Sequence, residues 1–377
     1  MPQTGASQDI GRLRFPVEQS LGRRYPEHSH PYRNGFQRDR DRIVHARAFR
    51  RLENKTQVFA PGLFDHFRNR LTHTIEVSQI ARTVAGALGL NEDLTETLAL
   101  AHDIGHPPFA HSGEEELNRQ MARFGDRFDH NLHALHLVES FEQRYARFPG
   151  LNLTFEVREG MAKHSRDFER GEAPQLDEYL LGLRPPIEAQ LIDLADEIAY
   201  NTADLDDAFS ARLFTADQIA AEVPRYAEIW DEIAQHFPGA SEKVQFLEAL
   251  RRLIDWLVSG LIEGTSRAAL ASGAKTIEDV RHLPARIAAI SDGARATNTA
   301  LKQFLHAHVY YNDLLRQERR RSMAVIQELF EFFLAHPDRL PEPYDEQAHE
   351  NPPHRVVCDY IAGMTDGFCL RTHAELI

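Results

Sequence analysis

Apolar residues recur at helical spacing through most of the chain, and this periodicity constrains the fold more than any other feature of the sequence. Between Glu76 and Leu88 the apolar side chains fall three or four positions apart, and Gly89 follows as a stop signal. The same pattern spans residues 131–145, 187–205 and 244–262. Strand-like alternation is scarce, and the segment 151–155 is the one short candidate. The sequence therefore predicts an all-α protein.

The chain has 377 residues, which exceeds the usual size of one domain. We expect an N-terminal segment at 1–37, a helical main domain at 38–214 and a helical C-terminal lobe at 215–377. Residues 166–186 are polar and contain glycine and proline, so they are expected to form an excursion within the main domain. Residues 270–291 and 337–353 are expected to be irregular for the same reason, the second as an exposed proline-rich loop.

Four residues offer two imidazoles and two carboxylates to a single divalent metal: His73, His102, Asp103 and Asp196. His102 and Asp103 follow an apolar stretch, and Asp196 interrupts an apolar helical stripe. A carboxylate at a buried face needs a partner, and a metal ion is one. Such a donor set leaves room for water and phosphate oxygens in an octahedral shell, which is the outline of a hydrolase centre.

The segment 102–114 places further titratable groups close to these donors. Gly105 ends a helix and Pro107-Pro108 prevents it from resuming, so the residues that follow are presented from a turn or a short helix. His111 and Glu114 are three positions apart, and on a helical turn the carboxylate can orient one imidazole nitrogen. We therefore expect His111 and Glu114 to form an acid/base pair.

These residues, together with the blocks AFRRLENKTQVF, RLTHTIEVSQIAR, HDIGHPPFAHSGE and DYIAGMTDGF, resemble the HD-domain deoxynucleoside triphosphate triphosphohydrolases, the bacterial dGTPase-like family. The resemblance runs from about Arg38 to the C-terminus. It implies an HD-domain helical bundle with a helical C-terminal lobe. It also implies metal-dependent hydrolysis of deoxynucleoside triphosphates at the α-phosphorus, which yields a deoxynucleoside and inorganic triphosphate.

The resemblance implies a role for each matching position. His73, His102, Asp103 and Asp196 would hold one divalent ion per active site, with Mn or Mg favoured and Fe, Ni, Co or Zn also compatible. His111 would be the catalytic histidine and Glu114 its orienter. The substrate-binding positions would be Arg70, His106 and His130 near the phosphates, Tyr200 and Asp204 at the deoxyribose, and Gln57 and Lys163 as further contacts. Deoxynucleoside triphosphates could also act as effectors, and family analogy predicts a homo-oligomer.

Composition bounds the cellular setting. The net charge of −14 argues against a surface that coats nucleic acid, so single-stranded nucleic-acid binding has no support here. Arginines cluster between Arg38 and Arg51, where they would attract a triphosphate or form a solvated helical face. The two cysteines, Cys358 and Cys369, fit a reducing compartment. No segment is apolar enough to cross a membrane, so we expect a cytoplasmic protein.

Two other functions compete with this interpretation. One is a related phosphohydrolase activity, such as removal of the phosphate from a deoxynucleoside monophosphate. Arg70, His106 and His130 offer more phosphate-binding capacity than a monophosphate needs. The other is a nucleotide or nucleic-acid sensor with an inactive site, which the intact donor set and the His111/Glu114 pair argue against.

Overall fold

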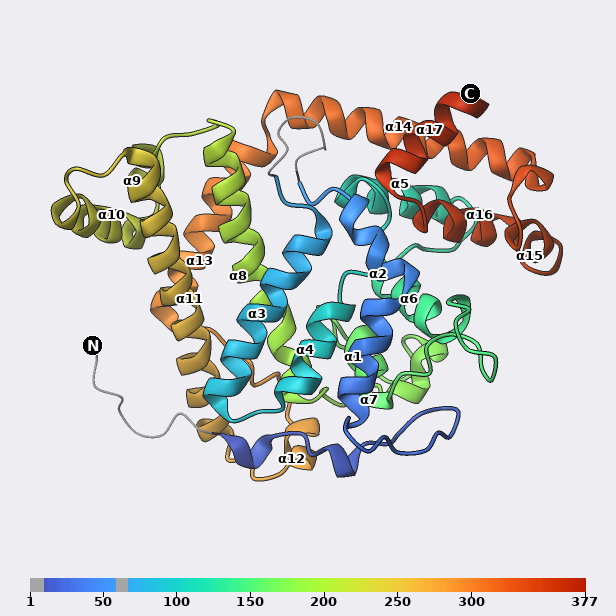
Figure 1. The fold of residues 1–377 in the computed structure, drawn as a ribbon, viewed down its shortest axis with the longest axis horizontal. Helices are drawn as coiled ribbons and strands as arrows, with labels where there is room; N and C mark the ends of the chain where they lie inside the picture. The colour runs from blue at the N-terminus through green and yellow to red at the C-terminus, as the bar shows by residue number, and fades with distance from the viewer. Residues whose placement is uncertain (1–9, 59–66) are drawn as a thin grey trace.

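The computed structural model describes residues 10–58 and 67–377, and within these ranges every named element is helical (Figure 1). The all-α prediction is confirmed. The short strand candidate at 151–155 forms no strand; Thr154 makes one isolated bridge with Arg23, and Phe155 begins a helix.

The N-terminal and central helices are α1 (Gly35–His45), α2 (Arg47–Arg51), α3 (Arg70–Leu88), α4 (Glu92–Ala101), α5 (Ala110–Ala122), α6 (His130–His136), α7 (Phe155–Ala162) and α8 (Ile187–Ser210). They are followed by α9 (Ala216–Glu222), α10 (Pro224–His236), α11 (Glu242–Ser272), α12 (Ile277–Arg281), α13 (Asp292–Leu305), α14 (Asp313–Ala335), α15 (Tyr344–Glu350), α16 (Pro353–Ala362) and α17 (Asp366–Leu376). Short 3-10 helices lie at 11–13, 17–19, 52–54, 174–179 and 337–339, and π turns lie at 137–141 and 306–310.

Local sequence signals explain where the site-bearing helices begin and end. Asn69 and Thr72 form a capping box at the start of α3, and Gly89 ends that helix in the left-handed conformation with φ 73°. Asn91 caps α4 by accepting a hydrogen bond from the Leu94 amide. The long α8 and α11 contain the predicted segments 187–205 and 244–262. The segment 131–145 forms α6 and then a π turn that ends at Phe141.

Helices α3, α4 and α8 pack together in the middle of the molecule, with α1 against α4 and α11 against α8 (Figure 1). Their facing side chains are fully buried and form the main core, which includes Val77, Val84, Leu94, Leu191 and Ile198. Burial of this apolar area is the dominant favourable term in folding. The same packing brings together the N-terminal end of α3, the C-terminal end of α4 and the middle of α8.

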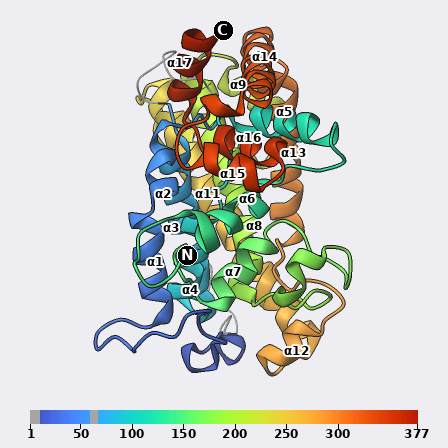
Figure 2. The ribbon, with the colours of Figure 1, turned by 90° about the vertical axis from the view of Figure 1, so that its right-hand side faces the viewer.

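A second core joins α5 to the C-terminal helices α14 and α16 (Figure 2). Leu117 and Met121 of α5 pack with Phe330 of α14 and with Val357 and Ile361 of α16. The apolar segment around residues 356–364 is thus interior to this chain. Cys358 and Cys369 are buried free thiols, and burial raises the pKa of both. Among the described residues no helix combines the length and hydrophobicity that crossing a bilayer requires.

The region 337–353 differs from the expected exposed loop. Residues Tyr344–Glu350 form the short helix α15, and Tyr344 and Ala348 are buried in the second core. The region 270–291 is irregular apart from the end of α11 and the single turn of α12.

Candidate active site

Three helices supply the expected metal donors. His73 lies in the first turn of α3, His102 and Asp103 follow the last residue of α4, and Asp196 lies in the middle of α8. The ligand atoms of His73, His102 and Asp103 all lie within 4.8 Å of one another. The Oδ1 atom of Asp196 lies 2.8 Å from His73 Nε2 and 3.8 Å from His102 Nε2. The structure therefore brings all four side chains together. Asp196 lies next to the two imidazoles and is closer to His73 than to His102.

The hydrogen bonding of His102 fits a metal ligand. Its Nδ1 lies 2.6 Å from the carbonyl oxygen of Ala99, which fixes the ring and directs Nε2 toward the two carboxylates. Within the described residues, the buried Nε2 atom has no hydrogen-bond partner. A buried nitrogen without a partner is costly, and a cation next to Asp103 and Asp196 would satisfy it. The donors present thus fit one divalent ion.

Mutual electrostatics keep the two carboxyl groups ionised. Burial acts to raise the pKa of Asp103, but Arg70 and the two nearby histidines outweigh it and hold the pKa well below its usual range. Burial opposes ionisation of Asp196 as well, and the hydrogen bond with His73 lowers its pKa. Burial lowers the pKa of His102, which favours the neutral imidazole that binds metals.

Arg70 and His106 both contact Asp103, one of the candidate donors. Arg70 Nη1 donates to Asp103 Oδ2 at 2.7 Å, and its buried Nε has no partner among the residues described. His106 Nδ1 lies 3.0 Å from Asp103 Oδ1. Burial, together with the positive charge of Arg70, lowers the pKa of His106 well below its usual range. One carboxylate, Asp103, thus positions a guanidinium and a neutral imidazole beside the metal donors.

The hydrogen-bond partner of Glu114 differs from the sequence-based expectation. Glu114 Oε1 lies 2.7 Å from Nδ1 of His130. His111 is less close: the ligand atoms of His106, His111 and Glu114 lie within 4.8 Å of one another. The reason is that the start of α6 packs against the turn at Gly105, where an added Cβ would lie 2.1 Å from the His130 carbonyl oxygen. Burial opposes the ionisation of Glu114, but the hydrogen bond with His130 lowers its pKa to about 2. The solvent-accessible His111 has a lowered pKa because of partial desolvation and the charge of Arg70.

The expected sugar-facing residues meet a third side chain that the sequence did not indicate. Tyr310, in the π turn at 306–310, donates to Asp204 Oδ2 at 2.5 Å. Its ring also stacks on that of Tyr200, with the centroids 6.0 Å apart. Asp204 is buried, which raises its pKa to about 7. The contact joins positions 106 residues apart, and no local spacing pattern could have revealed it.

Comparison with known proteins agrees with this geometry. The HD domain family matches residues 70–201, which contain all four candidate donors, and the phosphohydrolase-associated domain family matches residues 288–375. The chain is 43% identical to the deoxyguanosinetriphosphate triphosphohydrolase-like protein of Geobacter sulfurreducens over 93% of this chain and 90% of that protein. Proteins of the same description from a Caulobacter species and an Azoarcus species are each 44% identical, over 95% of this chain and 93% of their own length.

The chain belongs to the deoxyguanosinetriphosphate triphosphohydrolase-like family. It is therefore an HD-domain phosphohydrolase. Tyr310, within the segment that matches the phosphohydrolase-associated domain, contacts Tyr200, within the HD-domain match, and Asp204, three residues beyond that match.

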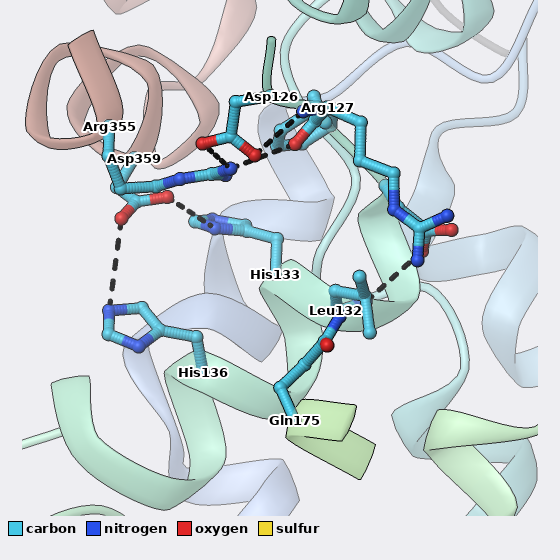
Figure 3. A pocket seen from close by; sticks show the side chains of 10 residues that line it. Asp126, Arg127, Leu132, His133, His136, Gln175, Arg355 and Asp359 are labelled. Carbon is cyan, nitrogen blue, oxygen red and sulfur yellow. Dashed lines mark hydrogen bonds and ion pairs between the residues drawn. The ribbon is translucent and has the colours of Figure 1, made fainter. Parts of the chain in front are cut away.

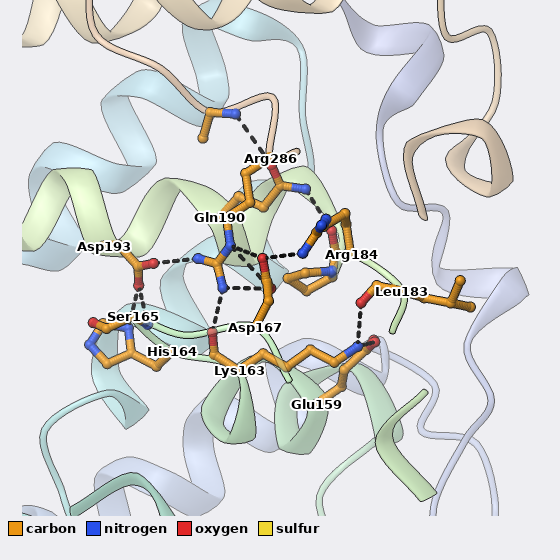
Figure 4. A network of polar contacts seen from close by, with 12 residues as sticks. Glu159, Lys163, His164, Ser165, Asp167, Leu183, Arg184, Gln190, Asp193 and Arg286 are labelled. Carbon is orange, nitrogen blue, oxygen red and sulfur yellow. Dashed lines mark hydrogen bonds and ion pairs between the residues drawn. The ribbon is translucent and has the colours of Figure 1, made fainter. Parts of the chain in front are cut away.

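Two expected substrate contacts of this dGTPase-like protein lie in different surroundings. Gln57 is buried, and its Oε1 has no partner within the described ranges. Lys163 is also buried, but its Nζ donates to Glu159 at 2.8 Å and to the carbonyl oxygens of Leu180 and Leu183. Figure 4 shows the lysine side chain extending away from His164 toward Glu159. The structure thus gives Lys163 a buried ion pair, because Glu159 lies four positions earlier on the same side of α7.

His164, next to that lysine, lies beside the candidate metal donors, although no motif in the sequence indicated it. Its ring centroid is 5.4 Å from that of His102. Its Nδ1 lies 2.6 Å from Asp193, one turn before Asp196 on α8, and Arg286 binds the same Asp193 (Figure 4). Burial acts to lower the pKa of His164, but the carboxylate of Asp193 raises it overall. The recurrence of Asp193 and Asp196 on one helix face is the signal that could have suggested this neighbour.

A separate pocket of about 290 Å³ is lined by residues of α6 and α16 and by the segment before α6 (Figure 3). Its lining includes Asp126, Arg127, His133, His136, Arg355 and Asp359. His133 Nδ1 lies 3.4 Å from Asp359, and Arg355 pairs with Asp126. None of the four candidate donors lines it, so this pocket is distinct from the metal cluster.

Proposed function

We propose that this protein is a deoxynucleoside triphosphate triphosphohydrolase that releases a deoxynucleoside and inorganic triphosphate. The observation that carries the proposal is the convergence of His73, His102, Asp103 and Asp196 beside Arg70 and His106. The name of the relatives, deoxyguanosinetriphosphate triphosphohydrolase-like protein, supports the choice of a triphosphate substrate and of the bond that is cleaved.

His73, His102, Asp103 and Asp196 would hold a divalent ion, Mn or Mg, which supplies Lewis acidity and lowers the pKa of a bound water. Arg70 is held by Asp103 through Nη1, and its remaining donors are available to phosphate oxygens. His106 lies with its ring centroid 3.8 Å from that of His130. These groups would bind and orient a chain of phosphates on one side of the donors.

Departure of the nucleoside requires a proton on the 5′ oxygen, because an alkoxide is a poor leaving group. We assign the donor to His130, with Glu114 as its orienter. The ionised Glu114 accepts the Nδ1 hydrogen, which leaves Nε2 of His130 to hold the proton that is transferred. His111, in the same cluster, would contact substrate. Tyr200 and Asp204, with Tyr310, would face the deoxyribose.

The test is incubation of the protein with each of the four deoxynucleoside triphosphates, singly and mixed, with added Mn²⁺ or Mg²⁺. Anion-exchange chromatography then separates tripolyphosphate from pyrophosphate and orthophosphate. The proposal predicts equal amounts of deoxynucleoside and tripolyphosphate, and no product from Asp103→Asn. Release of orthophosphate from a monophosphate alone would refute it. Activity that appears only in mixtures would indicate an effector site for the same nucleotides.

A further inference from the structure

The side chain of Asp366, near the C-terminus, binds two segments that lie far away in the sequence. Its Oδ2 accepts from the Thr56 amide at 2.8 Å and from the Thr56 hydroxyl, while its Oδ1 accepts from the Phe109 amide at 2.9 Å. Asp366 opens helix α17 and is 4% exposed. Both oxygens of a buried carboxylate are therefore used to hold two loops at once.

A second contact reinforces the first. The buried Nζ of Lys55 donates to the carbonyl oxygen of Ala362, at 3.1 Å, and to that of His106. Ala362 is the last residue of α16 and precedes α17 by a short turn. We call this group of contacting residues the C-terminal clamp: Lys55, Thr56, Phe109, Ala362 and Asp366.

One side of the clamp sets the start of α3. Thr56 forms an isolated bridge with Asn69, the cap of that helix, and the carbonyl oxygen of Lys55 accepts from the Arg70 amide at 3.1 Å. Because Arg70 and His73 occupy the first turn of α3, a shift of residues 55–56 would move the guanidinium of Arg70.

The other side of the clamp sets the start of α5. Phe109 and Ala110 have φ angles of 63° and 55°, a left-handed conformation that non-glycine residues rarely adopt. Phe109 occupies the cap position of α5 without a side-chain cap hydrogen bond. Such a turn persists only where its surroundings hold it, and Asp366 accepts its amide hydrogen. His111 is two residues further on, so its direction depends on this turn.

We propose that Asp366 is a positioning residue that fixes the substrate-binding side of the active site without touching a metal donor. The clamp reaches Arg70 through residues 55–56 and His111 through residues 109–110. It makes no hydrogen bond or ion pair with His73, His102 or Asp196 among the interactions described. The inference rests on the proposed function for the reaction used as the assay. The hydrogen bonds of the clamp are present whatever that reaction is.

The experiment compares Asp366→Asn with Asp279→Asn. Asp279 also accepts two backbone amide hydrogens near the start of a helix, those of Lys275 and Thr276 at 2.9 Å each. Its helix, α12, lies at the opposite end of the molecule from α17 (Figures 1 and 2). The control therefore removes an exposed carboxylate that also accepts two backbone amide hydrogens, at a distance from the site.

We expect Asp366→Asn to lower kcat about 10²-fold, the size of effect that a displacement of about 1 Å produces. The affinity for Mn²⁺, measured by calorimetry, should fall much less than kcat, because among the described residues the clamp makes no hydrogen bond with a donor side chain and acts on His73 only through the backbone of α3. Amide hydrogen exchange should accelerate in residues 52–58 and 105–113 but not in residues 77–88 of α3. Asp279→Asn should change none of these quantities.

A matched pair of milder variants covers the case in which Asp366→Asn does not fold. Thr56→Ser keeps both hydrogen bonds to Asp366 and should behave as the wild type, whereas Thr56→Val loses the hydroxyl and should lower kcat with faster exchange at 105–113. Wild-type exchange at 105–113 in Asp366→Asn or Thr56→Val would overturn the inference, as would a parallel loss of Mn²⁺ affinity. If the wild type hydrolyses no deoxynucleoside triphosphate, the proposed function fails, while the exchange data still decide on the clamp.

Discussion

Glu114 binds His130 twice, through the ring at 2.7 Å and through the backbone amide at 3.2 Å. One carboxylate on α5 therefore fixes both the direction of the imidazole and the first turn of α6 that carries it. The two groups form a unit, and their contributions to catalysis should not be independent.

A double-mutant cycle tests this unit. Glu114→Gln and His130→Asn should each lower kcat by about 10²–10⁴-fold, the usual contribution of a proton-transferring group. The double variant should lose little more than either single variant, because the first change already disables the pair. His111→Asn, which breaks no hydrogen bond of Glu114, should combine additively with Glu114→Gln. Additive losses for the Glu114 and His130 variants would contradict the pairing.

The metal donors are tested by metal content. His102→Ala and Asp103→Asn should lower Mn²⁺ affinity by more than the roughly 10–100-fold that follows loss of an outer partner. His111→Ala should retain the metal. Calorimetric titration of the metal-free variants measures the affinities. Unchanged Mn²⁺ binding by both donor variants would place the metal elsewhere.

Tyr310→Phe tests discrimination between deoxyribonucleotides and ribonucleotides. The change removes the hydroxyl that donates to Asp204 at 2.5 Å. An unsatisfied buried polar group costs about 1–3 kcal/mol, so the sugar-facing wall should lose its fixed arrangement. We expect the ratio of kcat/KM for dGTP over GTP to fall about tenfold or more. Equal hydrolysis of GTP and dGTP by the wild type would refute the role of Tyr200, Asp204 and Tyr310 at the sugar.

Asp204 makes a distinct contribution to the pH dependence of stability. Burial raises its folded-state pKa to about 7 from an ordinary value near 3.8. The folded protein thus binds a proton that the unfolded chain has released, so this contribution is fully present below about pH 4 and is lost as the pH rises through about 7. Its size is on the order of a few kcal/mol.

The corresponding measurement is the free energy of unfolding of the wild type minus that of Asp204→Asn, from urea titrations between pH 4 and pH 8. This difference should decrease as the pH rises, because asparagine does not titrate. A difference that is constant, or that grows with pH, would contradict the burial of a protonated carboxyl group.

Gly105→Ala tests the close approach of α6 to the loop after α4. An added Cβ would lie 2.1 Å from the carbonyl oxygen of His130 and 2.5 Å from the amide nitrogen of Ala134, so the helix must move. We expect a loss of about 1–3 kcal/mol in unfolding free energy, together with lower activity because His130 is displaced. Gly239→Ala is the control, since no atom lies within 4 Å of its added Cβ. Thermal denaturation and kcat of both variants decide the outcome.

The sequence predicted the helices that carry strong local signals. In α3 and α8 an apolar stripe of the right period faces the core, and Gly89 marks the predicted end of α3. That helix begins at Arg70, six residues before the predicted segment, because its first turn is polar and is fixed by the cap at Asn69. Such signals depend only on neighbours within a few positions, which is why periodicity reveals them. The short α15 was missed because its seven residues lie between prolines and glutamates that are typical of an exposed loop.

The residues of the candidate site could be predicted where their chemical type alone indicates a role. The hydrogen-bond partners could not be predicted where they come from distant parts of the sequence. The imidazoles and carboxylates of the metal cluster stood out by chemistry. The expected pair of Glu114 and His111 relied on their spacing within one helix. In the structure Glu114 accepts a hydrogen bond from His130, which lies on α6 and could not be found from that spacing. The ion pair of Lys163 does have a local signal, since Glu159 lies four positions earlier on the same helix.

All four candidate metal donors precede Asp366 in the sequence, and the last of them, Asp196, precedes it by 170 residues. During synthesis these donors therefore leave the ribosome before the carboxylate that holds Thr56 and Phe109 has been translated. A nascent chain can thus present its imidazoles and carboxylates to a cation while the turn at Phe109 is still unrestrained.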